Sequence, residues 1–277
     1  MARSPNSCSH REAPKVAPAR PGRCPRGFSL VDLLVVIAIL GVLLALVASA
    51  IGPVRKASRV TADLANLRQL AIASTNYATD HRGRLVDAQL PHGTAPLDEA
   101  ASFVNTLSPY TDSPLALRSP IDGSRHWRED GEPIPGSTGR YRATSYGLNN
   151  HLCREFSPWG AIDPARITDR ISLVAAPTNT VQFLLMAETG EFAGADHVHV
   201  EEWGGLGQAP AVASSQASTA AAGGVAGTPE ARSNYAFLDG HVATHAFGEL
   251  YLDATRNRFD PNQSAVFDLL AAAPETP

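Results

Sequence analysis

Residues 27–56 read GFSLVDLLVVIAILGVLLALVASAIGPVRK, and this stretch decides the fold of the chain. It contains a run without charged side chains from Leu33 to Ile51. As an α-helix this run is about 29 Å long, enough to cross the hydrocarbon core of a bilayer. It shows no polar stripe, unlike a helix packed on a soluble core. It is too long for the apolar part of a cleaved secretory signal, and no small-residue cleavage site follows. We therefore expect a transmembrane helix over residues 28–52.

The charges around this run predict its orientation. Residues 1–27 carry six basic side chains and one acidic side chain, a net charge of +5, whereas the whole chain carries −4, which leaves about −9 for the remainder. Basic segments beside a membrane span stay in the cytoplasm. We expect a disordered basic leader in the cytoplasm, because its many prolines and few large apolar side chains cannot form a core. The negative remainder argues against a nucleic-acid partner.

Asp32 lies just inside the apolar run, where a carboxylate is costly and usually has a partner. One interpretation places its side chain at the membrane interface, hydrated by headgroup water. A second follows from the order of glycine, aromatic, acid and apolar run from Gly27 onward. This order resembles the N-terminal signature of type IV prepilins and type II secretion pseudopilins.

That resemblance implies a processing site and an assembly contact. A prepilin peptidase would cut between Gly27 and Phe28, and the new amino terminus of Phe28 would be methylated. The carboxylate at the fifth mature position, Asp32, would pair with the terminal amine of a neighbouring subunit. The family usually has glutamate there, so Asp32 is shorter by one methylene group.

Beyond the apolar run, the helical pattern continues. Pro53 removes one backbone donor and should kink the helix. Side chains then recur at spacings of three and four, which predicts an amphipathic continuation over residues 53–82, with Asp63 off the packed stripe. The stripe consists of Val60, Leu64, Leu67, Ala71, Ser74 and Tyr77. The alternative is a free juxtamembrane coil that packs on nothing.

The remainder, residues 83–273, reads as an extracytoplasmic α+β domain. Its first part is rich in proline and predicts loops, with a short helix over Ala100–Tyr110. Strands are expected over Arg142–Asn149 and, fully buried, over Thr180–Met186. We expect a pilin-like α+β fold in which one long N-terminal helix packs on a small antiparallel sheet.

Three further features complete this domain. Asp239-Gly240 lies between two apolar stretches, which predicts a hairpin with a two-residue type I′ turn. Residues 204–232 are mostly small and polar, which predicts a flexible loop. Residues 274–277 are expected to form a tail.

A second resemblance concerns the same domain. The pieces SYGLN (145–149), PTNTV (177–181) and NYAFLDGHV (234–242) resemble a group of pseudopilin-like proteins with a His-X9-Asp-Gly motif near the C-terminus. Pro229 stands where that motif has its histidine. No role of that histidine is therefore carried over.

Two segments offer candidate metal ligands. His197, His199 and Glu201 would share one face of a strand, and two imidazoles with a carboxylate suit zinc. The alternative is a polar strand edge. Asp253 and Asp260 bring oxygen atoms to one loop, which makes calcium possible, although the spacing differs from a known calcium loop. The alternative is an ordinary turn, and no cofactor is required by the sequence.

Taken together, these patterns predict a bacterial inner-membrane protein with one span and an outer domain. The expected function is that of a pilin-like structural subunit in a type II secretion or type IV pilus-like filament, and not that of an enzyme. Its expected partners are the prepilin peptidase, other pilin-like subunits and the inner membrane. The alternative is a membrane-anchored metal-binding protein or enzyme that does not polymerise.

Overall fold

The computed structural model describes residues 29–93, 98–112, 114–137, 139–205 and 207–267. The chain divides into two units, residues 1–51 and 52–277. One helix, α1 (Leu30–Asp80), runs through this boundary and contains Pro53. The kink expected at Pro53 stays a prediction.

The first unit contains the apolar part of α1. Every large aliphatic side chain from Leu30 to Ile51 is exposed in the structure. By length and composition, α1 qualifies as a helix that can cross a membrane. A surface of this kind is stable in lipid or against other apolar helices, but not in water.

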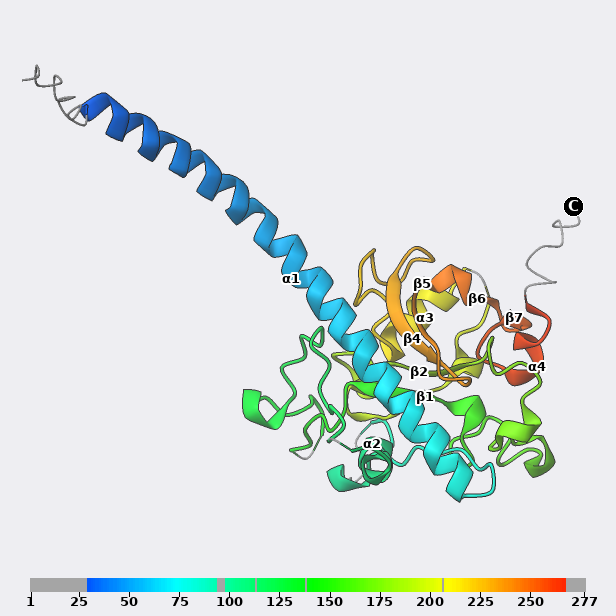
Figure 1. Cartoon of the computed structure of the whole chain (residues 1–277). Helices are drawn as coiled ribbons and strands as arrows, with labels where there is room; N and C mark the ends of the chain where they lie inside the picture. Colours follow the sequence, from blue (N-terminus) through cyan, green and yellow to red (C-terminus); the bar gives the residue numbers. More distant parts are fainter. Residues whose placement is uncertain (1–28, 94–97, 113, 138, 206, 268–277) are drawn as a thin grey trace, which may run out of the picture. The chain divides into compact units, whose positions relative to one another are not determined.

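The second unit is built around a five-stranded sheet with the order β3-β1-β2-β4-β5 (Figure 1). The strands are β1 (Tyr146–Asn149), β2 (Val181–Leu185), β3 (His197–Val198), β4 (Arg232–Phe237) and β5 (Val242–Ala246). A separate two-stranded sheet pairs β6 (Tyr251–Asp253) with β7 (Arg256–Asn257).

The main sheet is mixed, whereas an antiparallel sheet was predicted. β1, β2, β4 and β5 pair antiparallel, but β3 pairs parallel to β1. The reason lies in the path of the chain. β3 follows β2 and runs opposite to it, yet it joins the edge of β1, which also runs opposite to β2. The α+β class itself is as predicted.

Short helices and turns connect these strands. The α-helices are α2 (Phe103–Leu107), α3 (Ala209–Gln216) and α4 (Pro261–Ser264). The 3-10 turns are η1 (Glu99–Ala101), η2 (Ser108–Tyr110), η3 (Arg128–Asp130), η4 (Asn150–Leu152), η5 (Pro164–Arg166), η6 (Ile171–Leu173), η7 (Glu191–Gly194), η8 (Val200–Glu202) and η9 (Phe247–Glu249).

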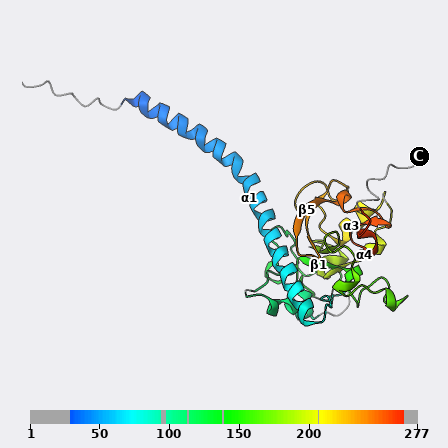
Figure 2. The same cartoon turned by 45° about the vertical axis from the view of Figure 1, so that its right-hand side comes forward.

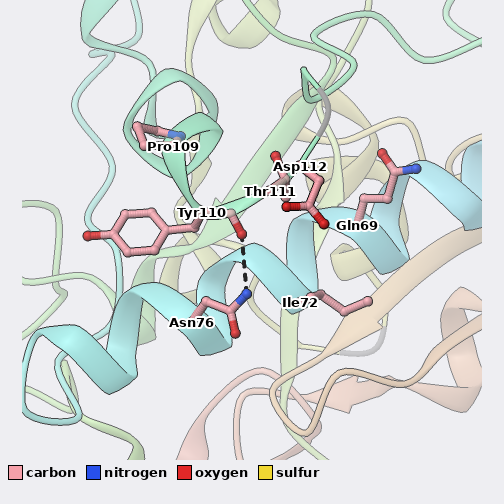
Figure 3. Close-up of a pocket in the computed structure, with 7 residues that line it drawn as sticks. All are labelled: Gln69, Ile72, Asn76, Pro109, Tyr110, Thr111 and Asp112. Atoms are coloured by element: carbon pink, nitrogen blue, oxygen red, sulfur yellow. Dashed lines mark hydrogen bonds between the residues drawn. The ribbon is translucent and has the colours of Figure 1, made fainter.

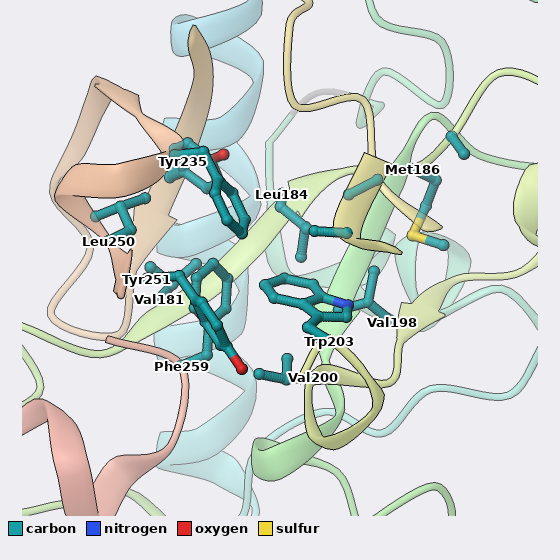
Figure 4. Packing of buried hydrophobic residues seen from close by; sticks show 14 of the residues in the cluster. Val181, Leu184, Met186, Val198, Val200, Trp203, Tyr235, Leu250, Tyr251 and Phe259 are labelled. Atoms are coloured by element: carbon teal, nitrogen blue, oxygen red, sulfur yellow. The ribbon is translucent and has the colours of Figure 1, made fainter. Parts of the chain in front are cut away.

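The sheet is covered on both faces. The C-terminal part of α1, coloured cyan, lies along one face in both views (Figure 1 and Figure 2). There Leu67 and Leu70 pack with Phe183. On the other face, Trp203 packs with a group of aromatic and aliphatic side chains (Figure 4). Because both faces are covered, all of β2 is buried, which explains why its residues other than Gln182 are apolar.

The amphipathic stripe of α1 faces this core, with one correction. Leu67, Ala71 and Ser74 are buried, as predicted. The structure therefore excludes the alternative in which the segment after the apolar run is a free coil that packs on nothing. Asp63, however, is fully buried, whereas the sequence analysis placed it off the stripe. It stands four residues before Leu67 and therefore on the same face of the helix.

The stretch 204–232 is more ordered than the predicted flexible loop. It contains α3, and Ala209, Ala213 and Ala217 are buried in the same cluster as Trp203. The sequence analysis expected too few large apolar groups to pack here. Small side chains instead let the helix backbone approach the core closely, so that alanine suffices.

The hairpin of β4 and β5 has a different turn from the predicted one. Gly240 N–H donates to the carbonyl of Phe237, and Phe237 N–H donates to the carbonyl of His241, both at 2.9 Å. Gly240 has φ of +92°, but Asp239 does not have a positive φ. A type I′ turn needs both, so the turn is a longer one that places glycine in the left-handed region.

Candidate functional site

The start of α1 is held by two side-chain hydrogen bonds. Ser29 Oγ accepts the N–H of Val31 at 3.3 Å, and Asp32 Oδ2 accepts the N–H of Ser29 at 3.2 Å. Ser29 thus caps the helix, and both bonds satisfy backbone donors that a helix start leaves free. The predicted processing residues Gly27 and Phe28 lie outside the described residues. The carboxylate of Asp32 is engaged with the backbone of Ser29, the first described residue.

The described part of this helix beyond the cap offers an uninterrupted apolar surface. No side chain of residues 30–51 is buried. Ser49 turns its hydroxyl onto the carbonyl of Leu46 at 2.8 Å, so its polar group is satisfied within the helix. The sequence from residue 22 to residue 48 matches one known family model.

That model is the prokaryotic N-terminal methylation motif, and it matches residues 22–48. The chain carries a prepilin-type signature. No curated protein and no solved structure matches the chain. The prepilin-type motif implies processing by a prepilin peptidase, pilin-like partners in general and anchoring in a membrane.

Asp63 forms a buried polar centre that joins the C-terminal part of α1 to the rest of the second unit. Its Oδ1 accepts hydrogen bonds from Ser119 Oγ at 2.5 Å and Tyr146 OH at 3.1 Å, and its Oδ2 accepts one from Asn234 Nδ2 at 2.8 Å. Burial raises the pKa of Asp63, and these three bonds oppose the rise only in part. The centre therefore fixes α1 to β1 and β4.

Sequence reasoning missed this centre although signals existed. Asp63 has the helical spacing of the stripe, and Tyr146 and Asn234 belong to the SYGLN and NYAFLDGHV pieces. Asn149, from the first piece, also donates to the carbonyls of Val181 and Phe259 at 2.8 and 2.6 Å. The polar residues of these pieces therefore act as connectors between distant segments.

A groove of about 460 Å³ lies between α1 and the segment that follows α2 (Figure 3). Gln69, Ile72 and Asn76 of α1 line one side, and Asn76 Nδ2 donates to the carbonyl of Tyr110 at 3.2 Å. Asp112 is the single acidic residue among those that line it.

His197, His199 and Glu201 lie close together, as predicted. They do not share one face of a strand, however. β3 ends at Val198, and Glu201 lies on η8. The Nε2 atoms of the two histidines are 3.2 Å apart, and His199 Nδ1 lies 3.1 Å from Glu201 Oε1. The ring of His197 is fully buried and stacks on Phe156 at 3.8 Å between centroids.

The electrostatics of this cluster separate the two histidines. Burial lowers the pKa of His197, although the nearby carboxylate of Asp196 opposes the shift. Burial would also lower the pKa of His199, but the hydrogen bond to Glu201 and its charge outweigh that effect and raise it. Burial would raise the pKa of Glu201, but hydrogen bonds from His199 and Asn150 lower it.

The predicted calcium loop is engaged in local contacts. Asp253 Oδ1 accepts from the backbone and hydroxyl of Thr255, and its Oδ2 pairs with Arg256 at 2.8 Å. Asp260 caps α4 through the N–H of Asn262. In the part of the chain that the structure describes, no three histidine, cysteine, aspartate or glutamate side chains form a ready metal site.

Proposed function

We propose that this chain is a structural subunit of a pilin-like filament of the type II secretion or type IV pilus class, and not an enzyme. The observation that carries the proposal is the coincidence of the methylation motif with a helical stretch, residues 30–51, whose apolar side chains are all exposed. In this account the peptidase removes residues 1–27 and Phe28 becomes the methylated amino terminus. The outer domain then faces away from the cytoplasm, on the far side of the inner membrane.

Assembly in this account depends on close packing of the apolar side chains of one copy of α1 against those of another. In lipid the helix has no hydrophobic incentive to associate, so close packing and polar contacts decide. An unpaired carboxylate at membrane depth is expensive, and a neighbour's terminal amine relieves that cost. Asp32 thus sets the register between subunits, while in a single copy its side chain caps the helix.

Three substitutions separate these two roles of Asp32. Asp32→Asn keeps an oxygen that caps the helix but removes the charge, Asp32→Ala removes both, and Asp32→Glu restores the residue usual in the resembling family. We expect all three variants to insert into the membrane. Only the wild type and Asp32→Glu should enter filaments, as measured by cross-linking between copies and electron microscopy of sheared material. Incorporation of Asp32→Asn at the wild-type level would refute the pairing role.

A further inference from the structure

A hollow of about 330 Å³ with a positively charged lining lies at the C-terminal end of α1. Three arginines line it, and Asp80 is the single acidic residue among the lining residues. The chain after residue 27 has more acidic than basic side chains, so this positive surface is a local exception. The lining residues are Asp80, His81, Arg82, Arg84 and Arg170, all in the second unit.

Two of the arginines are held directly opposite each other by the backbone. Arg84 and Arg170 form an antiparallel bridge that has a backbone hydrogen bond of 2.9 Å on each side. In such a non-hydrogen-bonded pair the two side chains leave the same face, with Cβ atoms about 4.5–5.5 Å apart. Like charges in this position destabilise a fold. An anion bound between the two guanidinium groups would replace their repulsion by attraction to a common partner.

The buried carboxylate beside these two arginines is already paired with a different arginine. Asp169 is 4% exposed, and its Oδ2 accepts hydrogen bonds from Arg154 Nε at 2.9 Å and Arg154 Nη2 at 2.5 Å. Arg84 Nε lies 3.8 Å from the same oxygen, which is beyond hydrogen-bond distance. Arg170 Nη1 donates to the backbone carbonyl of Arg82 at 3.0 Å, and that acceptor carries no charge. Most of the positive charge of Arg84 and Arg170 is therefore uncompensated.

The third arginine occupies a backbone position that favours glycine. α1 ends with a hydrogen bond of 2.7 Å from Gly83 N–H to the carbonyl of Ala78, the pattern of a Schellman motif. Arg82 takes the left-handed position of this motif with φ of +57°, and no other non-glycine residue has a positive φ in the part of the chain that the structure describes. A side chain in this conformation is unfavourable relative to glycine. The fold therefore keeps an arginine here at a cost in stability.

We propose that this hollow binds a doubly charged tetrahedral oxyanion, a phosphate group, between Arg82, Arg84 and Arg170. With a neutral His81, the lining residues carry three positive charges and one negative charge, an excess that matches a dianion. The C-terminal end of a helix carries only about half a negative charge, which offsets part of one arginine. A phosphate group offers an oxygen to each of three guanidinium groups, whereas a carboxylate has two oxygens.

Two sources present this group, free phosphate and a phosphomonoester at the end of a larger molecule. Arg82 and Arg84 are exposed, so the hollow is open to both. Binding there would link the end of α1 to the segment that carries Arg170. This role does not depend on whether the chain polymerises, because it uses residues of the second unit alone.

The test uses the full chain in a detergent without phosphate groups and in a buffer free of phosphate and sulfate. We expect inorganic phosphate to bind at one ion per chain by calorimetry. Arg84→Gln leaves Asp169 paired with Arg154 and should weaken binding about 10–100-fold. Arg166→Gln is the matched control, because Arg166 is also exposed but lies over the ring of Trp159, at 3.4 Å, and does not line the hollow. It should bind as the wild type does.

Arg82→Gly separates a ligand from a structural residue. It removes one guanidinium group and places glycine in the left-handed position, so the thermal midpoint without phosphate should rise while phosphate binding weakens about 10–100-fold. Phosphate should raise the thermal midpoint of the wild type and raise that of this variant less. A variant that binds phosphate as tightly as the wild type would overturn the role of Arg82 and with it the proposed site.

Competition experiments identify the class and the source of the anion. Acetate at the same concentration should not displace phosphate, and displacement by acetate as effective as by phosphate would overturn the assignment to a tetrahedral oxyanion. Glycerol 3-phosphate that binds more tightly than inorganic phosphate would support a phosphomonoester, and the reverse order would support free phosphate. Absence of saturable binding of both at one per chain would overturn the proposal.

Discussion

At the scale of single residues, the second unit depends on a few buried polar side chains that join distant segments. Asp63 connects α1 to β1 and β4, and Arg142 connects a loop to three backbone carbonyls and Asp122. Each group is buried, so its bonds are shielded from water and its loss leaves several partners unsatisfied. These residues therefore contribute more to stability than their number indicates.

Asp63 gives a pH-dependent prediction. Because its folded pKa is raised, the folded state holds this proton more tightly than the unfolded state, whose pKa is close to 3.8. Its contribution to stability is therefore fully present below pH 3.8 and is lost as the pH rises through the folded pKa. The difference in unfolding free energy between wild type and Asp63→Asn should change across that window, as measured by denaturant unfolding of the full chain. A pH-independent difference would contradict the account.

A second substitution at the same position measures the bonds themselves. Asp63→Ala leaves Ser119, Tyr146 and Asn234 without their common acceptor, which should cost about 3–5 kcal/mol. Thermal unfolding of the full chain in detergent measures this loss. Thr61→Ala, two residues away on the exposed side of α1, is the control and should change stability by less than about 0.5 kcal/mol.

Arg142 allows a double-mutant cycle. Its guanidinium is 1% exposed and its Nε lies 2.8 Å from Asp122 Oδ2. Arg142→Met strands a buried carboxylate and should destabilise the chain by about 3–5 kcal/mol. The double variant Arg142→Met with Asp122→Asn should cost less than the two single changes added together. Additive costs, from the same unfolding measurement, would show that the pair is not coupled.

At the scale of elements, the sequence predicted those that local pattern determines. The stripe of α1, the buried strand β2 and the hairpin around Gly240 follow from spacing and composition within one segment. The burial of Asp63 follows from its spacing relative to Leu67, but its partners were not predictable in this way, because Ser119 and Asn234 lie far along the chain. The parallel pairing of β3 likewise depends on an edge of β1 that no local pattern specifies.

The same limit applies to α3 and to the candidate metal site. Alanine-rich sequence at 209–217 is compatible with either a loop or a closely packed helix, and contact with Trp203 decides between them. His197 and His199 were recognised as a pair, but their Nε2 contact requires the chain to leave the strand after Val198. His92, whose ring lies 5.1 Å from that of His199 between centroids, comes from a segment about a hundred residues earlier and gave no local signal.

Gly240 supplies a prediction for the hairpin. Its φ of +92° is unfavourable for a side chain, although no atom lies within 4 Å of an added Cβ. Gly240→Ala should therefore cost about 1–2 kcal/mol through backbone strain alone. Gly205→Ala meets no atom within 4 Å either and has no positive φ, so it is the matched control and should be nearly neutral. Equal effects of the two changes on the thermal midpoint would contradict the assignment of strain.

At the scale of the whole molecule, the two units have different features and, in our proposal, different roles. The first unit presents an apolar helix with an acid in its first turn, and the second presents a folded α+β domain with its own core. The prepilin-type motif lies at residues 22–48, at the N-terminal side of this division. In our proposal the first unit determines membrane insertion and assembly, and the second determines what the assembled surface displays.

The central claim is that a peptidase frees Phe28 as a methylated amino terminus, and intact mass spectrometry of the protein extracted from its host membrane tests it most directly. The account predicts a mass equal to residues 28–277 plus one methyl group, with N-methylphenylalanine as the first residue in fragment spectra. Recovery of a membrane-bound chain that retains residues 1–27 would contradict processing and, with it, the proposed filament.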